Sequence, residues 1–293
     1  MPVQKLPLGI CWGTLIKASL PELIHEAGRN GFGTIAVTPP SYRRCLDSGT
    51  SAADLRRMLA DNGVRVTVID PLLAGLPGSP RPEDVPDNLR DGFLHDEDYC
   101  YEVAEALGAK VINLAHFLGK SVPLPDMAGA IAAISRRAAQ HGLAVSLEFI
   151  PGTGMPDLVT ANELVELAGE SNLGVLFDTW HFVRSGGTLQ QLRALPPGRI
   201  NAVQISDRIP PPPGAAYVPM SGRLFPGEGE QPLDEILKGV FANNASLSVE
   251  MEVFSADLAA MPVAAAAERA AEAARWWLAG KGASIRWPGA MPR

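Results

Sequence analysis

Three apolar stretches that follow one another decide the fold: LAVSLEFI at residues 143–150, LGVLFDTW at 173–180 and INAVQIS at 200–206. Each has the length and composition of a buried β-strand, and a segment of helical period lies between one stretch and the next. Strands that alternate with helices form parallel sheets, because the helix returns the chain to the start of the next strand. This part of the chain therefore predicts an α/β fold.

The same alternation extends over the whole chain. We expect strands at residues 7–14, 34–39, 64–71, 110–117, 143–150, 173–180, 200–206 and 246–254, and helices near 21–30, 51–62, 96–108, 126–141, 160–170, 188–194, 232–243 and 262–280. Eight strands and eight helices predict a closed (β/α)8 TIM barrel. No GxGxxG or Walker sequence supports an open doubly wound sheet, and no linker divides the chain. We expect one domain over residues 1–293, with the barrel at about 7–282 and a short C-terminal tail.

The composition limits the classes of protein. Of the 293 residues, 46% are hydrophobic, which suits a large buried core. The formal net charge of −7 disfavours nucleic acid as a partner, because phosphate backbones bind basic surfaces. Apolar runs stay far below the ~20 residues of a bilayer helix, and the first residues show no export signal. We therefore expect a cytoplasmic protein with no membrane or nucleic-acid partner, and we leave open whether it forms a homo-oligomer.

Polar side chains stand near the ends of four consecutive predicted strands. Glu148 lies near the end of the fifth, Asp178 near the end of the sixth, Gln204 in the seventh and Glu252 in the eighth. The carboxyl ends of the strands form the face of a TIM barrel where catalytic groups gather. We therefore expect these four side chains to lie together.

The last strand, SVEMEVF, carries two glutamates on one face. Glu250 and Glu252 alternate with Val249, Met251 and Val253, so both should point into the barrel while the apolar residues face the helices. Two residues of strand separate them by about 6.6 Å along the strand. Glu252 should lie at the mouth and Glu250 one layer deeper.

Buried carboxylates are costly unless they are paired or bound to a cation. A divalent ion at the mouth would gather all four side chains and neutralise the three carboxylates. Oxygen ligands favour Mn²⁺ or Mg²⁺, with Co²⁺ and Zn²⁺ as alternatives. We therefore predict one divalent metal ion held by Glu148, Asp178, Gln204 and Glu252.

Several short motifs, in this order, resemble the sugar phosphate isomerase/epimerase family of the xylose isomerase-like TIM barrels. The motifs are LEFIPGTGMPD at residues 147–157, FDTWHFVRSGG at 177–187, VQISD at 203–207, Arg223 followed by PGEG at 226–229, and VEMEVF at 249–254. The resemblance implies the same four metal ligands, with a Glu before the final Phe favouring Glu252. It also implies that His181 and Arg223 contact the substrate, and that Glu228 belongs to a loop that closes over it.

Gln204 departs from that family, most of whose members carry His at this position. An amide oxygen is a weaker ligand than imidazole but still binds a hard cation. A Gln here is also similar to the bacterial 3-dehydroshikimate dehydratases of the same superfamily, which are lyases. The reaction class is therefore open while the metal site is retained.

Several further polar residues admit either a functional or a purely structural role. His116 follows the fourth strand and is a candidate substrate donor, and Asp207 follows the seventh strand and is a candidate for binding a hydroxyl group. For both, a structural role is about equally expected. Cys11 has the character of a small buried hydrophobe. The Pro-rich stretch that begins at Ile209 is expected to overhang the barrel mouth as part of a lid.

These residues predict an isomerase or epimerase that acts on a small polyhydroxylated carbonyl substrate. One of Glu148 and Glu252 would remove a proton beside the carbonyl and the other would return it, through an enediolate. A dehydratase of the 3-dehydroshikimate or keto-inositol type shares that chemistry and is the alternative. An endonuclease IV-like phosphodiesterase is remote, because three zinc ions require more histidines than the five present. A silent sugar-binding protein has no use for four retained metal ligands.

Overall fold

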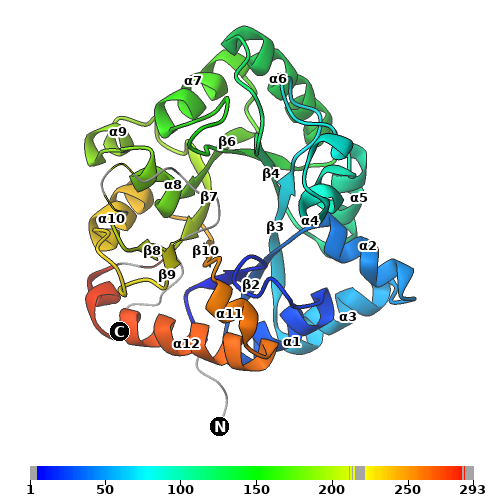
Figure 1. Ribbon diagram of the computed structural model, residues 1–293, viewed down its shortest axis with the longest axis vertical. Coiled ribbons are helices and arrows are strands. Elements are labelled where there is room, and N and C mark those ends of the chain that lie inside the picture. Colours follow the sequence, from blue (N-terminus) through cyan, green and yellow to red (C-terminus); the bar gives the residue numbers. More distant parts are fainter. Residues whose placement is uncertain (1–4, 211, 213, 215–221, 286, 288–293) are drawn as a thin grey trace.

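Eight parallel strands close into a barrel that a ring of helices surrounds (Figure 1). The computed structural model describes residues 5–210, 212, 214, 222–285 and 287. The barrel strands are β1 (Gly9–Cys11), β2 (Thr34–Val37), β3 (Arg65–Leu72), β4 (Val111–Ala115), β5 (Ala144–Glu148), β6 (Leu173–Asp178), β7 (Ile200–Ile205) and β10 (Val249–Met251). Seven lie within their predicted strand segments and β3 extends one residue beyond its segment, 64–71, so the predicted fold class is confirmed.

The strands follow the chain order around the barrel, and β1 closes it by pairing with both β2 and β10. The register aligns polar positions on neighbouring strands: Asp178 of β6 lies beside Gln204 of β7, which in turn lies beside Glu250 of β10. Glu252 lies one residue beyond β10, where its backbone N–H donates to the carbonyl of Ile205 at 2.9 Å. The pairing therefore brings the polar ends of β6, β7 and β10 to one rim.

Helices pack their apolar sides against the outside of the strands. Those predicted from the sequence are α1 (Leu20–Asn30), α3 (Ala52–Asn62), α5 (Glu97–Leu107), α6 (Leu124–Gln140), α7 (Leu158–Ala168), α9 (Leu189–Arg193), α10 (Leu233–Asn243) and α12 (Val263–Ala279). Helix α1 shows why the ends of the helices could be predicted from the sequence. Ser19 and Glu22 form a capping box at its start, and Gly31 ends it with φ of 91°, a conformation that favours glycine.

Shorter elements lie in the loops that follow the strands, and the sequence analysis did not resolve them. They are the helices α2 (Pro39–Asp47), α4 (Asp87–Arg90), α8 (Thr179–Arg184) and α11 (Ala256–Ala260), the 3₁₀ turns Pro82–Asp84, Asp91–Phe93 and Lys281–Ser284, and the antiparallel pair β8 (Asp207–Arg208) and β9 (Arg223–Leu224). Most are too short for an apolar period to emerge, although α2 has nine residues. Those after β2, β3, β6 and β7 carry side chains that line the cavity at the barrel mouth.

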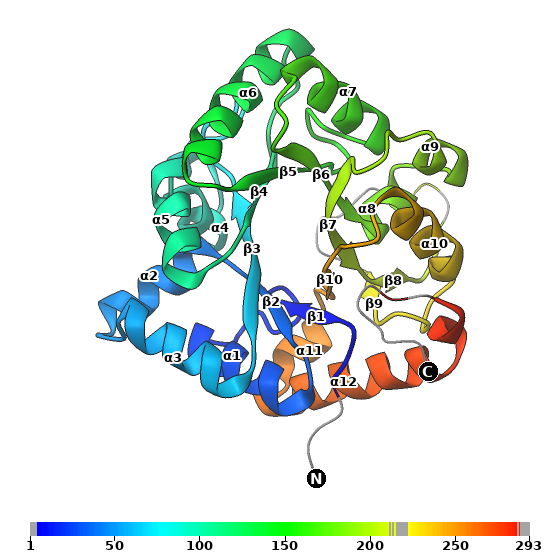
Figure 2. The same cartoon turned by 180° about the vertical axis from the view of Figure 1, so that it is seen from behind.

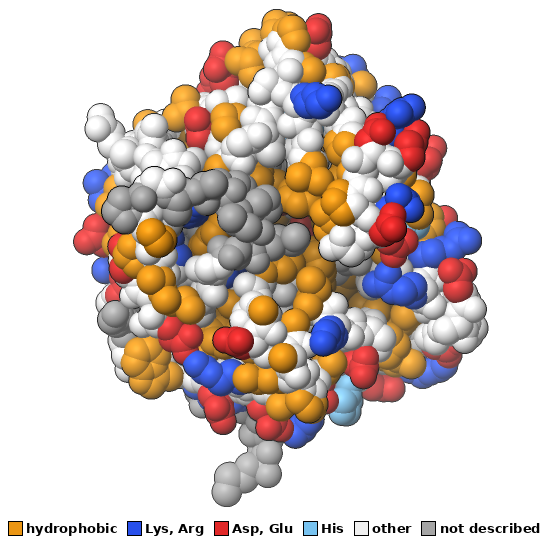
Figure 3. All heavy atoms as spheres, viewed as in Figure 1, with side chains coloured by type: hydrophobic (Ala, Val, Ile, Leu, Met, Phe, Trp, Pro, Cys, Tyr) orange, Lys and Arg blue, Asp and Glu red, His pale blue; other side chains and the backbone are white. Residues whose placement is uncertain are grey.

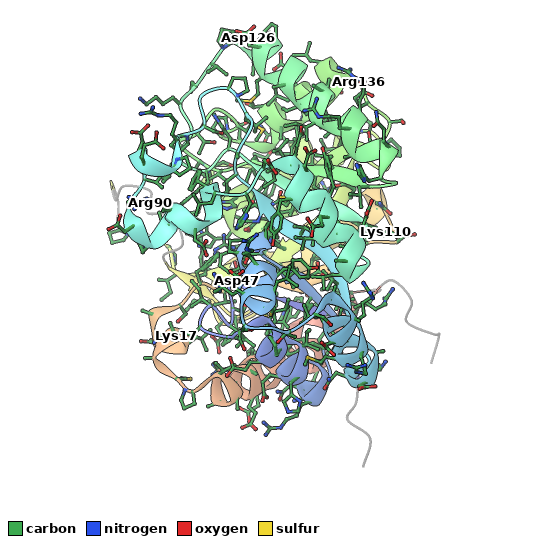
Figure 4. The ribbon with its side chains drawn as sticks, turned by 90° about the vertical axis from the view of Figure 1, so that its right-hand side faces the viewer. Lys17, Asp47, Arg90, Lys110, Asp126 and Arg136 are labelled. Atoms are coloured by element: carbon green, nitrogen blue, oxygen red, sulfur yellow. The ribbon has the colours of Figure 1, made fainter. Side chains whose placement is uncertain are left out.

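The two ends of the barrel are distinct. Figure 1 looks onto the end where the strands finish, and Figure 2 shows the opposite end, where they begin. The side view in Figure 4 separates them: Arg90, which follows β3, lies at one end, and Lys110, which precedes β4, lies at the other. A cavity of about 370 Å³ lies at the C-terminal ends of the strands, and one of about 610 Å³ at their N-terminal ends.

Two expectations fall largely outside the described residues: the lid formed by the Pro-rich stretch, of which 211, 213 and 215–221 are not described, and the C-terminal tail beyond residue 287. Within the part of the chain that the structure describes, none of the helices combines the length and apolar character needed to cross a bilayer.

Candidate active site

The four predicted ligands line one buried cluster at the C-terminal mouth. Glu148, Asp178, Gln204 and Glu252 are each at least nine-tenths buried. The amide nitrogen of Gln204 donates to Oε1 of Glu252 at 3.1 Å, and Nε2 of His181 lies 3.3 Å from Oε1 of Glu148 and 3.7 Å from Oδ2 of Asp178. The structure thus gathers side chains from four neighbouring strand ends in a single site.

Arg223 supplies the positive charge of this cluster. Its Nη1 donates to Oδ2 of Asp178 at 2.7 Å and lies 3.1 Å from Oε2 of Glu252, so it bridges two of the predicted ligands. The guanidinium carbon lies 4.9 Å from the Trp180 ring centre and 5.4 Å from that of Phe254, which orients it by cation–π contact. The side chain comes from β9, within the excursion after β7, rather than from a barrel strand.

Asp178 has two structural tasks. Its Oδ1 accepts hydrogen bonds from the backbone N–H groups of Trp180 and His181 at 2.7 and 3.3 Å, which caps the N-terminus of α8. Its Oδ2 faces Arg223. Burial alone would raise the pKa of Asp178, but the charge of Arg223 outweighs it and lowers the pKa below its ordinary value. Asp178 is therefore an ionised carboxylate in a fixed orientation.

Burial has the opposite outcome at the two glutamates. It raises the pKa of Glu148 to about 8, with a further contribution from the charges of Asp70 and Asp178. It also raises the pKa of Glu252 well above its ordinary value, although Arg223 partly offsets this. His181 is buried as well, which lowers its pKa to about 4 and keeps the ring neutral. Without a further cation, ionising both glutamates beside Asp178 in this buried site is therefore unfavourable.

Three residues that the sequence analysis did not single out for the site lie in its floor. Asp70 of β3 is 2% exposed and accepts hydrogen bonds from Asn113 of β4 and from Cys11 of β1. Asn113 also donates to Glu148 at 2.7 Å, and Cys11 donates to Glu252 at 3.1 Å. Burial raises the pKa of the Cys11 thiol well above its ordinary value, so it stays protonated. Asp70 ends a strand read as VTVID, so the rule that found Glu148 could have found it.

Three other predicted contacts lie outside the cavity. Ala115 and Phe117 line it, but His116 between them turns away, and its Nδ1 accepts the N–H of Gly154 at 3.1 Å. Any side chain larger than hydrogen at Gly119 or Gly154 would collide with the ring. In the described structure His116 therefore joins the loops after β4 and β5 instead of donating to a substrate.

The two predicted contacts in the excursion after β7, Asp207 and Glu228, also form structural interactions here. Asp207 accepts backbone hydrogen bonds from Gly227 and Gln231, both at 3.0 Å, and so fixes the turn that follows β9. Glu228 forms an ion pair with Arg269 of α12 and does not line the cavity. In this structure the loop's own backbone and α12 engage the two carboxylates, and the expected roles of Asp207 and Glu228 toward the substrate stay predictions.

The cavity above the floor has mostly apolar walls. Trp12, Phe93, Phe117, Ile150 and Phe254 line it together with the polar floor residues. Figure 3 shows this face, where hydrophobic side chains gather around the hollow near its centre. Charged groups are therefore concentrated at the bottom of a pocket whose sides hold water away from them.

The donor set fits a divalent cation. The ligand atoms of Glu148, Asp178 and His181 lie within 4.8 Å of one another, and those of Cys11, Asp70 and Glu252 form a second such group. The amide oxygen of Gln204 is buried and has no hydrogen-bond partner among the described residues. Excess carboxylate and an unused oxygen are what a hard cation requires. The buried acidic residues therefore form a candidate metal site.

The chain belongs to the xylose isomerase-like TIM barrel family, whose sequence pattern matches residues 22–279. The resemblance deduced from the short motifs is thereby confirmed at the level of the family.

Two curated enzymes are related in sequence. The 3-dehydroshikimate dehydratase of Pseudomonas aeruginosa is 25% identical over 256 residues, which make up 85% of this chain and 38% of that enzyme. The inosose isomerase of Halalkalibacterium halodurans is 29% identical over 123 residues, 41% of this chain and 43% of that enzyme. The matched part thus spans about two fifths of the length of each relative. Relatives of this kind are enzymes, and they divide between lyase and isomerase chemistry.

Among solved structures, the IolI protein with a bound zinc atom superposes with a TM-score of 0.79 at 18% identity, over 95% of this chain and 99% of that one. This likeness establishes the fold.

Proposed function

We propose that this protein is a divalent-metal-dependent enzyme that isomerises or epimerises a small polyhydroxylated carbonyl compound. The observation that carries the proposal is the gathering of Glu148, Asp178, Gln204 and Glu252 at the floor of one cavity, with His181 and Arg223 beside them. Mn²⁺ or Mg²⁺ suits this oxygen-rich set best.

A divalent ion held by Glu148, Asp178, Gln204 and Glu252 would supply Lewis-acid polarisation of a substrate carbonyl and so acidify the neighbouring C–H group. The remaining chemistry belongs to the side chains. Glu148 comes from β5 and Glu252 from beyond β10, so the two carboxylates approach the cavity from different sides. One is suited to remove the proton and the other to return it, since burial raises the pKa values of both above their ordinary range.

His181 and Arg223 have complementary roles toward the substrate. Neutral His181 lies 3.3 Å from Glu148 and is suited to hydrogen-bond a substrate hydroxyl beside that base. Arg223 remains charged, because Asp178 and Glu252 raise its pKa against the effect of burial. A fixed cation of this kind stabilises the negative charge that develops on the substrate oxygen when the proton leaves.

The charges in the cavity favour an unphosphorylated substrate. Arg44 and Arg223 are the cations among the described residues that line it, and both are engaged, Arg44 with Asp91 at 2.7 Å and Arg223 with Asp178. The stretch 211–221, PPPGAAYVPMS, contains no basic residue. A phosphate group would therefore enter a pocket with little spare positive charge. The apolar walls suit a compact or cyclic keto-polyol.

Dehydration is the second candidate, and Gln204 favours it. The related 3-dehydroshikimate dehydratase aligns with 85% of this chain, and such lyases begin with the same proton abstraction. If the carbanion expels a β-hydroxyl group instead of being reprotonated, the product is an unsaturated ketone. Nothing in the geometry of Glu148 and Glu252 separates these outcomes, so the product decides.

The test is a panel of unphosphorylated and phosphorylated ketoses, inososes and 3-dehydroshikimate, incubated with Mn²⁺-loaded protein in D₂O and followed by NMR. Deuterium entering beside a carbonyl, with no loss of water, supports the isomerase or epimerase. Loss of water with a new vinyl signal supports the dehydratase. A protein that binds no divalent ion and catalyses no exchange would refute both.

A further inference from the structure

Asp70 is the most heavily hydrogen-bonded side chain of the floor, yet the proposed chemistry gives it no task. Its Oδ1 accepts a hydrogen bond from Nδ2 of Asn113 at 2.6 Å. Its Oδ2 accepts from Nε2 of Gln204 at 3.0 Å, from the indole N–H of Trp12 at 3.1 Å and from the thiol of Cys11 at 3.3 Å. The Cys11 thiol has one hydrogen, which it shares between Asp70 and Glu252, so the two amides and the indole are the donors committed to Asp70.

The two carboxamides on Asp70 are arranged in the same way. Asn113 donates one N–H to Asp70 and the other to Oε2 of Glu148 at 2.7 Å. Gln204 donates one N–H to Asp70 and the other to Oε1 of Glu252 at 3.1 Å. Each amide therefore links Asp70 to one of the two candidate bases, so Asp70 connects Glu148 and Glu252 through Asn113 and Gln204.

This arrangement fixes which end of each amide faces the carboxylates. Reversing Gln204 would set its oxygen against the oxygens of Asp70 and Glu252, and reversing Asn113 would do the same at Asp70 and Glu148. In the observed orientation the amide oxygens of both residues are buried without a hydrogen-bond partner among the described residues. Both oxygens are left as acceptors for a group outside this network.

We propose that Asp70 is a positioning residue, which holds Gln204 with its oxygen toward the metal and its nitrogen away from it, and which sets Glu148 and Glu252 through the two amides. The inference rests on the proposed metal-dependent function. In metal sites with histidine ligands, a carboxylate on the far ring nitrogen fixes the ligand's orientation. Asp70 performs this task for an amide ligand, whose two ends would otherwise compete for the same position.

Asp70 does not act as a base in this arrangement. Both of its oxygens already accept hydrogen bonds from fixed donors of the protein, Oδ1 from Asn113 and Oδ2 from Gln204 and Trp12. The effect of Asp70 on metal binding must therefore be transmitted through Gln204 and Asn113. It should depend on the presence of those two amides.

The test is a double-mutant cycle on metal affinity. Wild type, Asp70→Asn, Gln204→Ala and the double variant are stripped with EDTA and titrated with Mn²⁺ by calorimetry. Asp70→Asn should weaken binding about 10–100-fold when Gln204 is present, the range of outer-shell ligand partners. In the Gln204→Ala background the same change should weaken binding several-fold less than in wild type, because only the path through Asn113 to Glu148 remains. The matched control is Glu26→Gln, a buried carboxylate of α1 that pairs with Arg29 outside the cavity, which should leave affinity unchanged.

A second variant separates position from charge. Asp70→Glu keeps the charge but displaces the carboxylate by one methylene, so it should lose affinity as Asp70→Asn does. The visible spectrum of bound Co²⁺ should change in the same sense in both variants and in Gln204→Ala, because all three disturb the same ligand.

The outcomes are distinct. If wild type binds no divalent ion, the proposed function and this inference both fail. If wild type binds the ion but Asp70→Asn costs the same with and without Gln204, or Asp70→Glu binds normally, Asp70 acts only through its charge and this inference alone is overturned. If Asp70→Asn does not fold, the cycle is decided by Asp70→Glu and by the Co²⁺ spectrum.

Discussion

Two glutamates on the same face of the last barrel strand segment lie in opposite environments. Glu252 lies at the C-terminal mouth among Gln204, Cys11 and Arg223, within the cavity proposed to hold substrate. Glu250 lies two residues earlier, faces the cavity at the other end of the barrel and accepts a hydrogen bond from Thr67 at 2.7 Å. Position along the strand, rather than residue type, therefore separates a candidate base from a structural carboxyl group.

The largest expected difference between the two is in turnover. Glu252→Gln and Glu148→Gln each remove a base while keeping an oxygen at the site, so kcat should fall by at least about 10²-fold. Glu250→Gln, the matched control on the same strand face, should leave kcat within a few-fold of wild type. Steady-state kinetics on the substrate found by the D₂O panel measures this. A Glu250→Gln variant that is inactive beside an active Glu252→Gln would reverse the assignment.

The next largest effect is expected on metal preference, which should change with substitutions at the mouth and not elsewhere in the barrel. Gln204→His replaces a neutral oxygen by imidazole, which suits Zn²⁺ and Co²⁺ better than Mn²⁺. The relative affinity should shift toward those ions on the order of tenfold, or 1.4 kcal/mol. Competitive titration of the stripped protein checks this, and Glu250→Gln should show the wild-type preference. An unchanged preference would show that Gln204 does not ligate the metal.

The pH dependence of stability reports on the other end of the barrel. Burial raises the pKa of Glu250 from its ordinary 4.5 to about 7. The folded state then binds more protons than the unfolded state between these values, so this group lowers stability as the pH rises from about 4.5 to 7. Glu250→Gln should flatten that part of the profile, measured by urea unfolding with metal bound. A profile identical to wild type would mean that Glu250 stays ionised throughout.

The smallest effect is expected from the partner of Glu250. Thr67→Val keeps the shape of the side chain but removes the hydroxyl that donates to Oε1 of Glu250. The free energy of unfolding at pH 8 should fall by about 1–2 kcal/mol, because a hydrogen bond to a charged group is lost. Metal affinity should not change. A loss of metal affinity would show that the two ends of the barrel are coupled.

The fold and the main site residues followed from one regularity. Glu148, Asp178, Gln204 and Glu252 end consecutive parallel strands, and such strands finish at the same face, so their convergence could be predicted without coordinates. Asp70 obeys the same rule at the end of β3, but the strand pattern gave no sign that four donors converge on it. The hydrogen bonds of Cys11 depend on register across the barrel closure, which no local pattern encodes.

The directions of side chains outside the strands could not be predicted from the sequence, for a physical reason. His116, Asp207 and Glu228 lie in loops, where direction is set by local turns rather than by a period of two or 3.6 residues. His116 turns away between two lining residues, and Asp207 is held by the backbone of its own loop. Arg223 was named from the family motif, but its bridge between Asp178 and Glu252 follows from the β8–β9 pair, which is too short to detect from sequence.

Because the excursion after β7 supplies Arg223, the site is encoded in two separate parts of the chain. The anionic floor is encoded in barrel strands, whose spacing the fold itself holds constant. The cation is encoded in a loop between β7 and α10, where changes of length and sequence leave the barrel pairing untouched. An engineer could therefore exchange residues 207–231 as a cassette, retaining the carboxylate floor of the barrel while replacing the cation that contacts it.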